Sequence, residues 1–154
     1  MGDWWNPLII RECLIGPKRF DELHGFLEVG RNILSGRLVQ LVEQGVLEKQ
    51  LYQQKPPRYR YRLTDKGYDA ALILFAMMPF GERWFFDGET PIQLYSRSTG
   101  KKVRPILVDA DTGQPIDPRD VYSGPGPAFP MNESTSRARF IEYYERLNRE
   151  ALKP

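Results

Sequence analysis

The sequence predicts an α+β fold, in which three short helices precede a two-stranded hairpin, a longer helix, a small β-extension and a terminal helix. Three observations predict this order. Apolar residues recur at helical spacing through the first 44 residues. Residues 46–63 change to strand-like alternation around a proline-marked turn. After residue 87 glycine and proline become frequent, until helical spacing returns near the C-terminal end.

The composition limits the size and class of the protein. The chain has 154 residues, 41% of them hydrophobic, which suits one ordinary domain or a small domain with an extension. The first residues lack the basic region followed by an apolar region that marks a signal peptide. The longest apolar run, residues 70–80, is shorter than the ~18 residues of a membrane span. A single cysteine excludes an internal disulfide and a cysteine-rich zinc site. We therefore expect a cytoplasmic protein that binds no metal, cofactor or membrane.

The first predicted helix spans residues 4–15. Trp5, Ile9 and Cys13 recur every four residues and so share one apolar face. Asp3 is placed to cap the helix, and a glycine-proline pair follows its end. Burial on this face predicts a structural Cys13, because an apolar site raises the pKa of a thiol and keeps it unreactive. A redox-sensing thiol is the alternative.

Two further helices are expected at residues 20–27 and 31–44, separated by a break at Val29-Gly30. Leucines form the apolar stripe of the second of these helices, and Gly45 is placed to end it. Two short helices joined by a tight turn that contains glycine are typical of a helix-turn-helix. In that motif the second helix enters the major groove of DNA.

Residues 46–52 and 59–63 predict two strands, joined by a polar turn that contains two prolines. In the second strand, tyrosine and leucine side chains alternate with arginines that point the opposite way. The arginines are Arg58, Arg60 and Arg62. Residues 49–62 hold five basic side chains and no acidic one. Such a patch suits the DNA backbone, and a solvated strand face is the alternative.

Thr64 can cap a fourth helix that begins at Asp65 and runs towards Trp84. Its middle, residues 70–78, is apolar nearly all round, and such a helix needs cover on more than one side. A chain of this size cannot supply that cover alone, so we infer a subunit interface. Pro79 is expected to bend or break the helix near its end.

The last third of the chain predicts an extension and a helix. Short strands are expected at residues 92–96 and 103–109, between turns rich in glycine. Residues 136–152 predict a helix with one apolar seam. The predicted division of the chain is a helix-turn-helix domain with a dimerisation helix at 1–86, a β-extension at 87–130 and a C-terminal helix at 131–154.

Several segments, taken in order, resemble the HxlR family of bacterial transcription regulators, which are relatives of the MarR type. The segments are residues 8–12, 16–23, 32–38, 45–48 and 56–67. The resemblance covers roughly residues 3–86 and implies a winged helix-turn-helix with the hairpin as its wing. It also implies a homodimer that binds an inverted-repeat operator, with the helix from Asp65 forming much of the dimer contact. Some relatives carry cysteine pairs in the extension, which this chain lacks.

Relatives usually have another helix before the segment equivalent to Asp3. Here the chain starts close to that point. Either its start is truncated, or the dimer relies more on the helix after Thr64 and on the C-terminal helix.

The expected DNA contacts fall into two groups. Arg31, Asn32 and Ser35 lie near the start of the reading helix and can reach base edges, since arginine pairs with guanine and asparagine with adenine. Arg37 is expected either to reach a phosphate or to form an internal salt bridge. Arg62, near the base of its strand, is expected to pair with an acidic neighbour. The remaining expected contacts are to phosphates, from Lys18, Arg19, Lys55, Arg58 and Arg60.

Catalytic chemistry is not expected. His24 is the only histidine and has no second ligand at metal-binding spacing, and neither a phosphate-binding glycine loop nor a serine elbow occurs. Two functions stay open: a dimeric regulator of transcription, and a winged helix that binds another protein. The arginine row favours the regulator. A small aromatic effector could bind between the dimer helices, near Trp5, Phe75, Met77, Met78 and Trp84.

Overall fold

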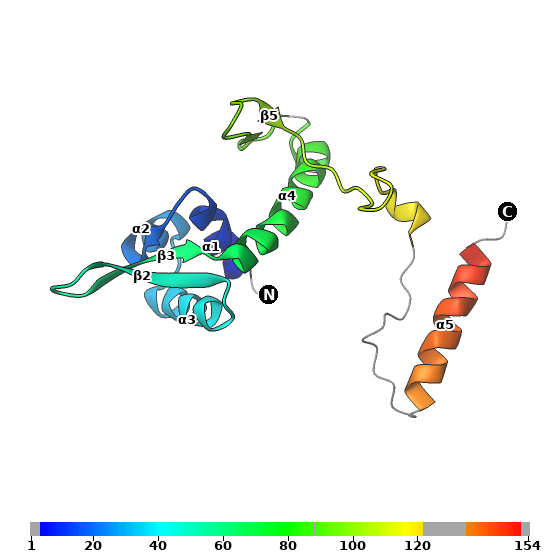
Figure 1. Cartoon of the computed structure of the whole chain (residues 1–154), viewed down its shortest axis with the longest axis horizontal. Helices are drawn as coiled ribbons and strands as arrows, with labels where there is room; N and C mark the ends of the chain where they lie inside the picture. Colours follow the sequence, from blue (N-terminus) through cyan, green and yellow to red (C-terminus); the bar gives the residue numbers. More distant parts are fainter. Residues whose placement is uncertain (1–3, 88, 122–134, 152–154) are drawn as a thin grey trace. The chain divides into compact units, whose positions relative to one another are not determined.

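The computed structural model describes residues 4–87, 89–121 and 135–151 (Figure 1). The chain divides into two compact units, Met1–Pro105 and Ile106–Pro154. The first unit contains four helices and two small sheets among its described residues. None of the described helices is both long enough and apolar enough to cross a membrane.

Three helices open the first unit, and all three predicted positions are confirmed. They are α1 (Trp5–Leu14), α2 (Phe20–Leu27) and α3 (Arg31–Glu43). The predicted cap Asp3 lies outside the described residues, and Trp4 at the N-cap position of α1 makes no side-chain cap bond. Gly45 follows the end of α3 with φ of +68°, a left-handed conformation that glycine adopts without strain.

The core forms where these helices meet the base of the hairpin. The leucine stripe of α3 is buried as predicted, at Leu34, Leu38 and Leu41. Ile9 and Cys13 of α1 are buried against it, on the face that their spacing predicted. Each buried aliphatic side chain of this kind contributes roughly 1.5–3 kcal/mol to folding, so this cluster sets the angle between α2 and α3.

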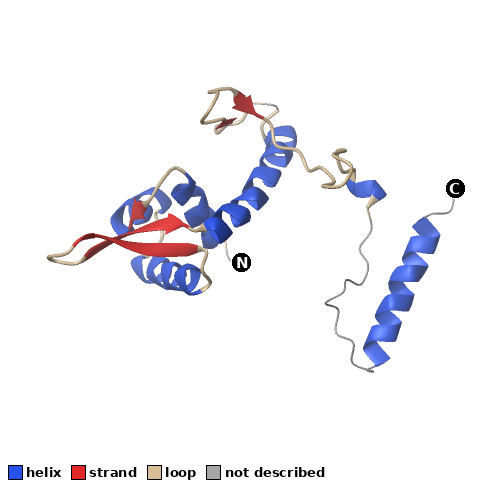
Figure 2. Cartoon of the chain, viewed as in Figure 1, coloured by secondary structure: helices blue, strands red, loops and turns tan. Residues whose placement is uncertain are grey.

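The main sheet has three antiparallel strands in the order β1-β3-β2 (Figure 2). They are β1 (Lys18–Arg19), β2 (Leu47–Gln53) and β3 (Arg58–Leu63). The hairpin of β2 and β3 confirms the predicted wing. The sequence did not predict β1, because two residues are too few to show a period. It forms where the turn between α1 and α2 runs beside the second edge of β3. The helices and this sheet together make a winged helix-turn-helix.

The fourth helix, α4 (Asp65–Phe85), starts at the base of the sheet. Thr64 caps it as predicted: its Oγ1 accepts the N–H of Gly67 at 3.2 Å and donates to the carbonyl of Gly45 at 2.6 Å. Of the bend or break predicted at Pro79, the break does not occur, since the helix continues for six more residues. A proline removes only one backbone bond, and the turns on both sides keep theirs.

A two-stranded hairpin of β4 (Leu94–Tyr95) and β5 (Lys102–Val103) follows α4. The strands lie where the sequence predicted an extension but are shorter. Arg97 ties this hairpin to α1, since its Nη2 donates to the carbonyl of Leu14 at 3.1 Å. Glu82 of α4 ties it from the other side through Lys102 at 3.9 Å and Arg104 at 3.6 Å.

In the second unit, residues 106–121, the described part before its helix, have little regular structure. A single bridge joins Val108 to Pro115 around a turn in which Asp109 Oδ1 accepts two backbone N–H groups, each at 2.8 Å. A short 3₁₀ helix spans Pro118–Asp120, and α5 spans Thr135–Ala151, which confirms the predicted terminal helix. The expected domain boundary at residue 130 lies outside the described residues.

Candidate nucleic-acid interface

The first turn of α3 presents three polar side chains that lie outside its buried leucine stripe. Arg31, Asn32 and Ser35 are all exposed. Ser35 follows Arg31 by four residues and Asn32 by three, which places the three side chains along one edge of the helix. Contact of this edge with base edges in a groove stays a prediction.

Arg31 does not extend alone into solvent. Its Nη2 lies 3.0 Å from Oδ1 of Asp21, and its guanidinium carbon lies 5.4 Å from the centre of the Phe20 ring. Both partners are at the start of α2. Sequence reasoning missed this cluster, because the pairing depends on the turn that brings two helix starts together.

Arg37 lies further along α3 and is partly buried. Its Nη1 donates to Oε1 of Gln40 at 3.1 Å. Gln40 is neutral, so this bond decides neither of the two roles that the sequence left open for Arg37, a phosphate contact and an internal salt bridge. A phosphate contact by Arg37 would have to share the guanidinium with this bond.

Strand β3 carries its arginines at alternate positions and therefore on one face, as its sequence predicted. Arg60 Nε donates to Oε1 of Gln50 on the neighbouring strand at 2.8 Å, which orients its guanidinium. Arg62 pairs with Glu48, the acidic neighbour that the sequence led us to expect. Lys55 and Arg58 are exposed at and beside the tip. The cations therefore become more accessible towards the tip.

The tyrosine face of the wing is only partly inside the protein. Leu63 is buried and Tyr61 packs against the core, where burial raises the pKa of its phenol. Tyr59 is 39% exposed and lies under the ammonium group of Lys49, 4.0 Å from the ring centre. Tyr59 is therefore less buried than Tyr61 and Leu63, because the hairpin extends past the helices before it turns (Figure 2).

Strand β1 brings a second source of cations to the wing. Arg19 is paired in register with Arg60, so their side chains lie on the same face of the sheet. Arg19 is held by Glu22, whose carboxylate accepts its Nη2 at 3.1 Å and its backbone N–H at 2.7 Å. These bonds keep the pKa of Glu22 below its usual value. Lys18 Nζ lies 5.4 Å from the Phe26 ring centre.

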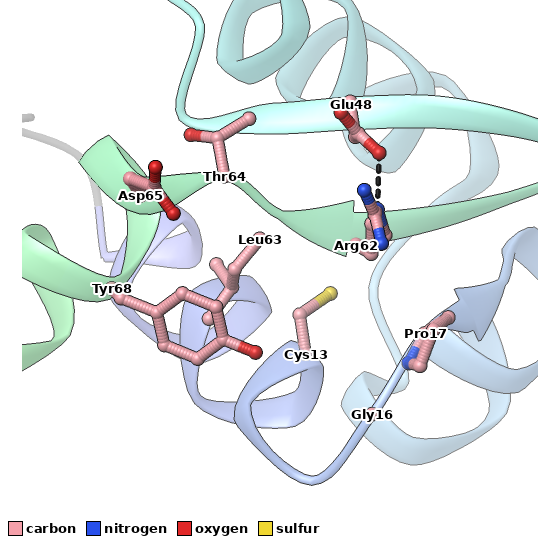
Figure 3. A pocket seen from close by; sticks show the side chains of 9 residues that line it. All are labelled: Cys13, Gly16, Pro17, Glu48, Arg62, Leu63, Thr64, Asp65 and Tyr68. Carbon is pink, nitrogen blue, oxygen red and sulfur yellow. Dashed lines mark hydrogen bonds and ion pairs between the residues drawn. The ribbon is translucent and has the colours of Figure 1, made fainter.

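A pocket of about 420 Å³ lies where the base of the wing, the start of α4 and the end of α1 meet (Figure 3). Cys13 lines it together with the Glu48–Arg62 pair, Asp65 and Tyr68. Cys13 is 2% exposed, and burial raises the pKa of its thiol to about 12. The predicted burial of Cys13 is confirmed.

Other kinds of site find less support. The described residues contain no group of three or more histidine, cysteine, aspartate or glutamate side chains that could hold a metal ion. The aromatic effector site expected between dimer helices requires a second subunit and stays a prediction.

Comparisons with known proteins point in one direction. Residues 1–89 match the family model described as HxlR-like helix-turn-helix. An uncharacterized HTH-type transcriptional regulator of Mycobacterium tuberculosis is 34% identical over 137 residues, which cover 88% of this chain and 87% of the relative. A proposed transcription factor from Pseudomonas aeruginosa has a similar structure, with a TM-score of 0.63, 38% identity, and coverage of 88% of this chain and 92% of that one. The reduced form of the transcriptional regulator YodB from Bacillus subtilis is similar over 57% of this chain and 87% of that one, with a TM-score of 0.50 and 29% identity.

Proposed function

The chain belongs to the HxlR-like helix-turn-helix family and is a transcription regulator, and from this premise we propose that it binds double-stranded DNA as a homodimer at an inverted-repeat operator. Each subunit places the start of α3 in a major groove and its wing on the adjacent backbone or minor groove. A two-fold protein dimer matches a two-fold repeat in the DNA.

One observation carries the DNA-binding part of the proposal. The exposed edge of α3 and the cationic face of the wing belong to one compact unit, so both can meet a single duplex. Arg31, Asn32 and Ser35 then supply contacts to bases, and Arg37 is a further candidate. The phosphate contacts come from Lys18, Arg19, Lys55, Arg58 and Arg60. Contacts of this second kind supply most of the salt-dependent affinity and little choice of sequence.

The homodimer rests on the outer face of α4. Apolar side chains more than half exposed follow each other along it: Tyr68, Leu72, Ile73, Met77, Phe80 and Trp84. Monomeric soluble proteins seldom expose an apolar stripe of this length. A second copy of the same helix would cover it, and α5 is a further candidate for the contact. An aromatic effector between the two α4 helices would gate DNA binding by changing their packing.

A second function, contact with another protein through the wing, is favoured by a different observation. Leu51, Tyr52 and Tyr59 are exposed on the hairpin, and an apolar wing surface suits a protein partner. The dependence of binding on salt separates the two functions, because release of counterions is specific to a polyanion.

The test begins with selection of bound sequences from a random pool of DNA duplexes by the wild-type protein. Binding to the enriched sequence is then measured at several salt concentrations. Each phosphate contact contributes about 0.9 to the slope of log affinity against log salt, so Arg58→Ala with Arg60→Ala should lower the slope by about 2 for each bound subunit.

The matched control is Arg119→Ala with Arg149→Ala. It removes the same charge from the second unit, where these arginines lie beside Asp117 and Glu145. The control should keep the wild-type slope. Absence of any enriched sequence at low salt would contradict the proposed function.

A further inference from the structure

Arg31 is held by two residues that no sequence pattern linked to it. Asp21 Oδ1 contacts its Nη2 at 3.0 Å, and the Phe20 ring lies beneath its guanidinium at 5.4 Å. The two partners are the first two residues of α2, and Arg31 is the first residue of α3. The helix-turn-helix therefore joins its two helix starts through one arginine.

We propose that Asp21, with Phe20, fixes Arg31 in the orientation in which it binds a base, so that Asp21 determines operator specificity without touching DNA. This inference rests on the proposed function and adds a positioning residue to it. The matching base is guanine, which presents the two acceptors O6 and N7 to an arginine in the major groove.

The geometry leaves Arg31 able to bind. A guanidinium has five N–H donors in a planar fork, and Asp21 contacts it through a single nitrogen. The guanidinium carbon lies over the Phe20 ring, and the nitrogen donors that Asp21 leaves unused can form a bidentate pair with guanine. An arginine whose rotamer is already fixed avoids about 0.5–1.5 kcal/mol of ordering cost on binding.

Fold stability does not explain this pair. The side chains of Arg31 and Asp21 are 63% and 81% exposed, and exposed ion pairs contribute little to stability. Capping of α2 does not explain it either, because Glu22 already accepts the backbone N–H of Arg19. Without Arg31, a carboxylate at this position would only repel a nearby phosphate chain, since the first helix of the motif crosses the DNA backbone.

The test uses the full chain and the duplex that the wild type selects from a random pool. Dissociation constants are measured for this operator and for a shuffled duplex of equal composition. Their ratio measures specificity. Four proteins are compared with wild type: Asp21→Asn, Arg31→Ala, the double variant, and Glu28→Gln, which removes an exposed charge from the end of the same helix.

Arg31→Ala should lower the specificity ratio about tenfold or more, the value of a bidentate contact to guanine. Asp21→Asn should lower it by about threefold to tenfold, while affinity for the shuffled duplex rises because one repulsive charge is gone. In the Arg31→Ala background, Asp21→Asn should leave the ratio unchanged. Glu28→Gln should alter both affinities alike.

Three results would overturn the inference. They are an unchanged or raised ratio in Asp21→Asn, a further loss when Asp21→Asn is added to Arg31→Ala, and an equal loss of specificity in Glu28→Gln. If the wild type enriches no sequence, the proposed function fails and the inference with it. If a sequence is enriched and one of the three results is found, only the inference fails.

Discussion

Gly67 lies where the start of α4 approaches the sheet closely. A Cβ at this position would lie 2.3 Å from the carbonyl oxygen of Val46 and 2.9 Å from Cδ2 of Leu63. The carbonyl of Val46 cannot move without shifting β2, the first strand of the wing, which begins at the next residue. Gly36, in the middle of α3, is the opposite case, because a Cβ there meets no heavy atom within 4 Å.

These two glycines give a matched prediction. Gly67→Ala should lower the free energy of unfolding by about 2–3 kcal/mol, since overpacking forces the backbone apart. Gly36→Ala should raise it by about 0.5–1 kcal/mol, because alanine favours the helix and clashes with nothing. Urea unfolding at one protein concentration measures both. Equal effects of the two substitutions would contradict the described packing of α4 on the sheet.

Cys13 gives a prediction about pH. Burial raises the pKa of its thiol from an ordinary value of 9.0 to about 12. Its contribution to stability is complete below pH 9, where folded and unfolded thiols are both protonated. It is lost as pH rises from about 9 to about 12, because the unfolded thiol ionises first. The stability difference between wild type and Cys13→Ala should therefore shift against the wild type by about 1.4 kcal/mol for each pH unit above 9.

Reaction with a thiol reagent checks the same burial at neutral pH. The folded wild type should react slowly, and urea should restore the rate of an unfolded thiol. Rapid modification of the folded protein would contradict a structural Cys13 and favour a redox-sensing one.

Residues inside the core were predictable from the sequence, and paired residues on the surface were not. The leucine stripe of α3 and the face of α1 that holds Cys13 follow from helical spacing alone. The contact between Asp21 and Arg31 depends on the angle between two helices, which is set by core packing. The bond between Gln50 and Arg60 depends on strand register, which the length of the hairpin turn did not fix.

At the scale of elements, the type and order of nearly every segment followed from periodicity. The exceptions have physical causes. Strand β1 is too short to carry a pattern and exists because β3 offers it an edge. At Pro79, where a bend or a break was expected, the helix does not break, because the turns on both sides hold the remaining bonds. Local sequence patterns are therefore outweighed where other parts of the fold or the rest of the helix supply backbone bonds.

The element whose role is most directly testable is α4. Leu72→Glu places a charge in the exposed apolar stripe and should convert a wild-type dimer to a monomer, since an unpaired charge in an interface is costly. Val39→Glu is the control, because Val39 is an exposed apolar residue on a different helix. Sedimentation velocity distinguishes the species. A wild type that is monomeric at every concentration would show that the stripe has another occupant.

At the scale of the whole molecule, every expected DNA contact lies in Met1–Pro105. A chain that ends at Pro105 should therefore unfold cooperatively, with a free energy within about 1 kcal/mol of the full chain. It should also keep its selected operator. Calorimetry and DNA binding measure the two properties. Loss of cooperative unfolding would contradict the division at Pro105, while a folded chain that no longer dimerises would assign α5 to the dimer contact.

The sequence-based division of the chain at residues 86 and 130 stays a prediction. Composition marked where the glycine-rich and proline-rich part begins. It could not indicate that Arg97 and Glu82 fasten the first hairpin of that part to α1 and α4. Such attachments join residues far apart in the chain, and no local pattern records them.

The two-residue strand β1 has a consequence for how DNA would be chosen. It pairs with β3 of the wing and leads directly into α2, the first helix of the helix-turn-helix, so the wing and this motif are joined by a ladder as well as by the core. The wing and the helix-turn-helix would therefore contact DNA at two places whose separation is fixed. A duplex with an unsuitable groove width or bend must be deformed to fit, at a cost of order 1–6 kcal/mol that depends on its stiffness. Base pairs between these two contacts, which no side chain reaches, are therefore expected to influence affinity through the stiffness of the duplex.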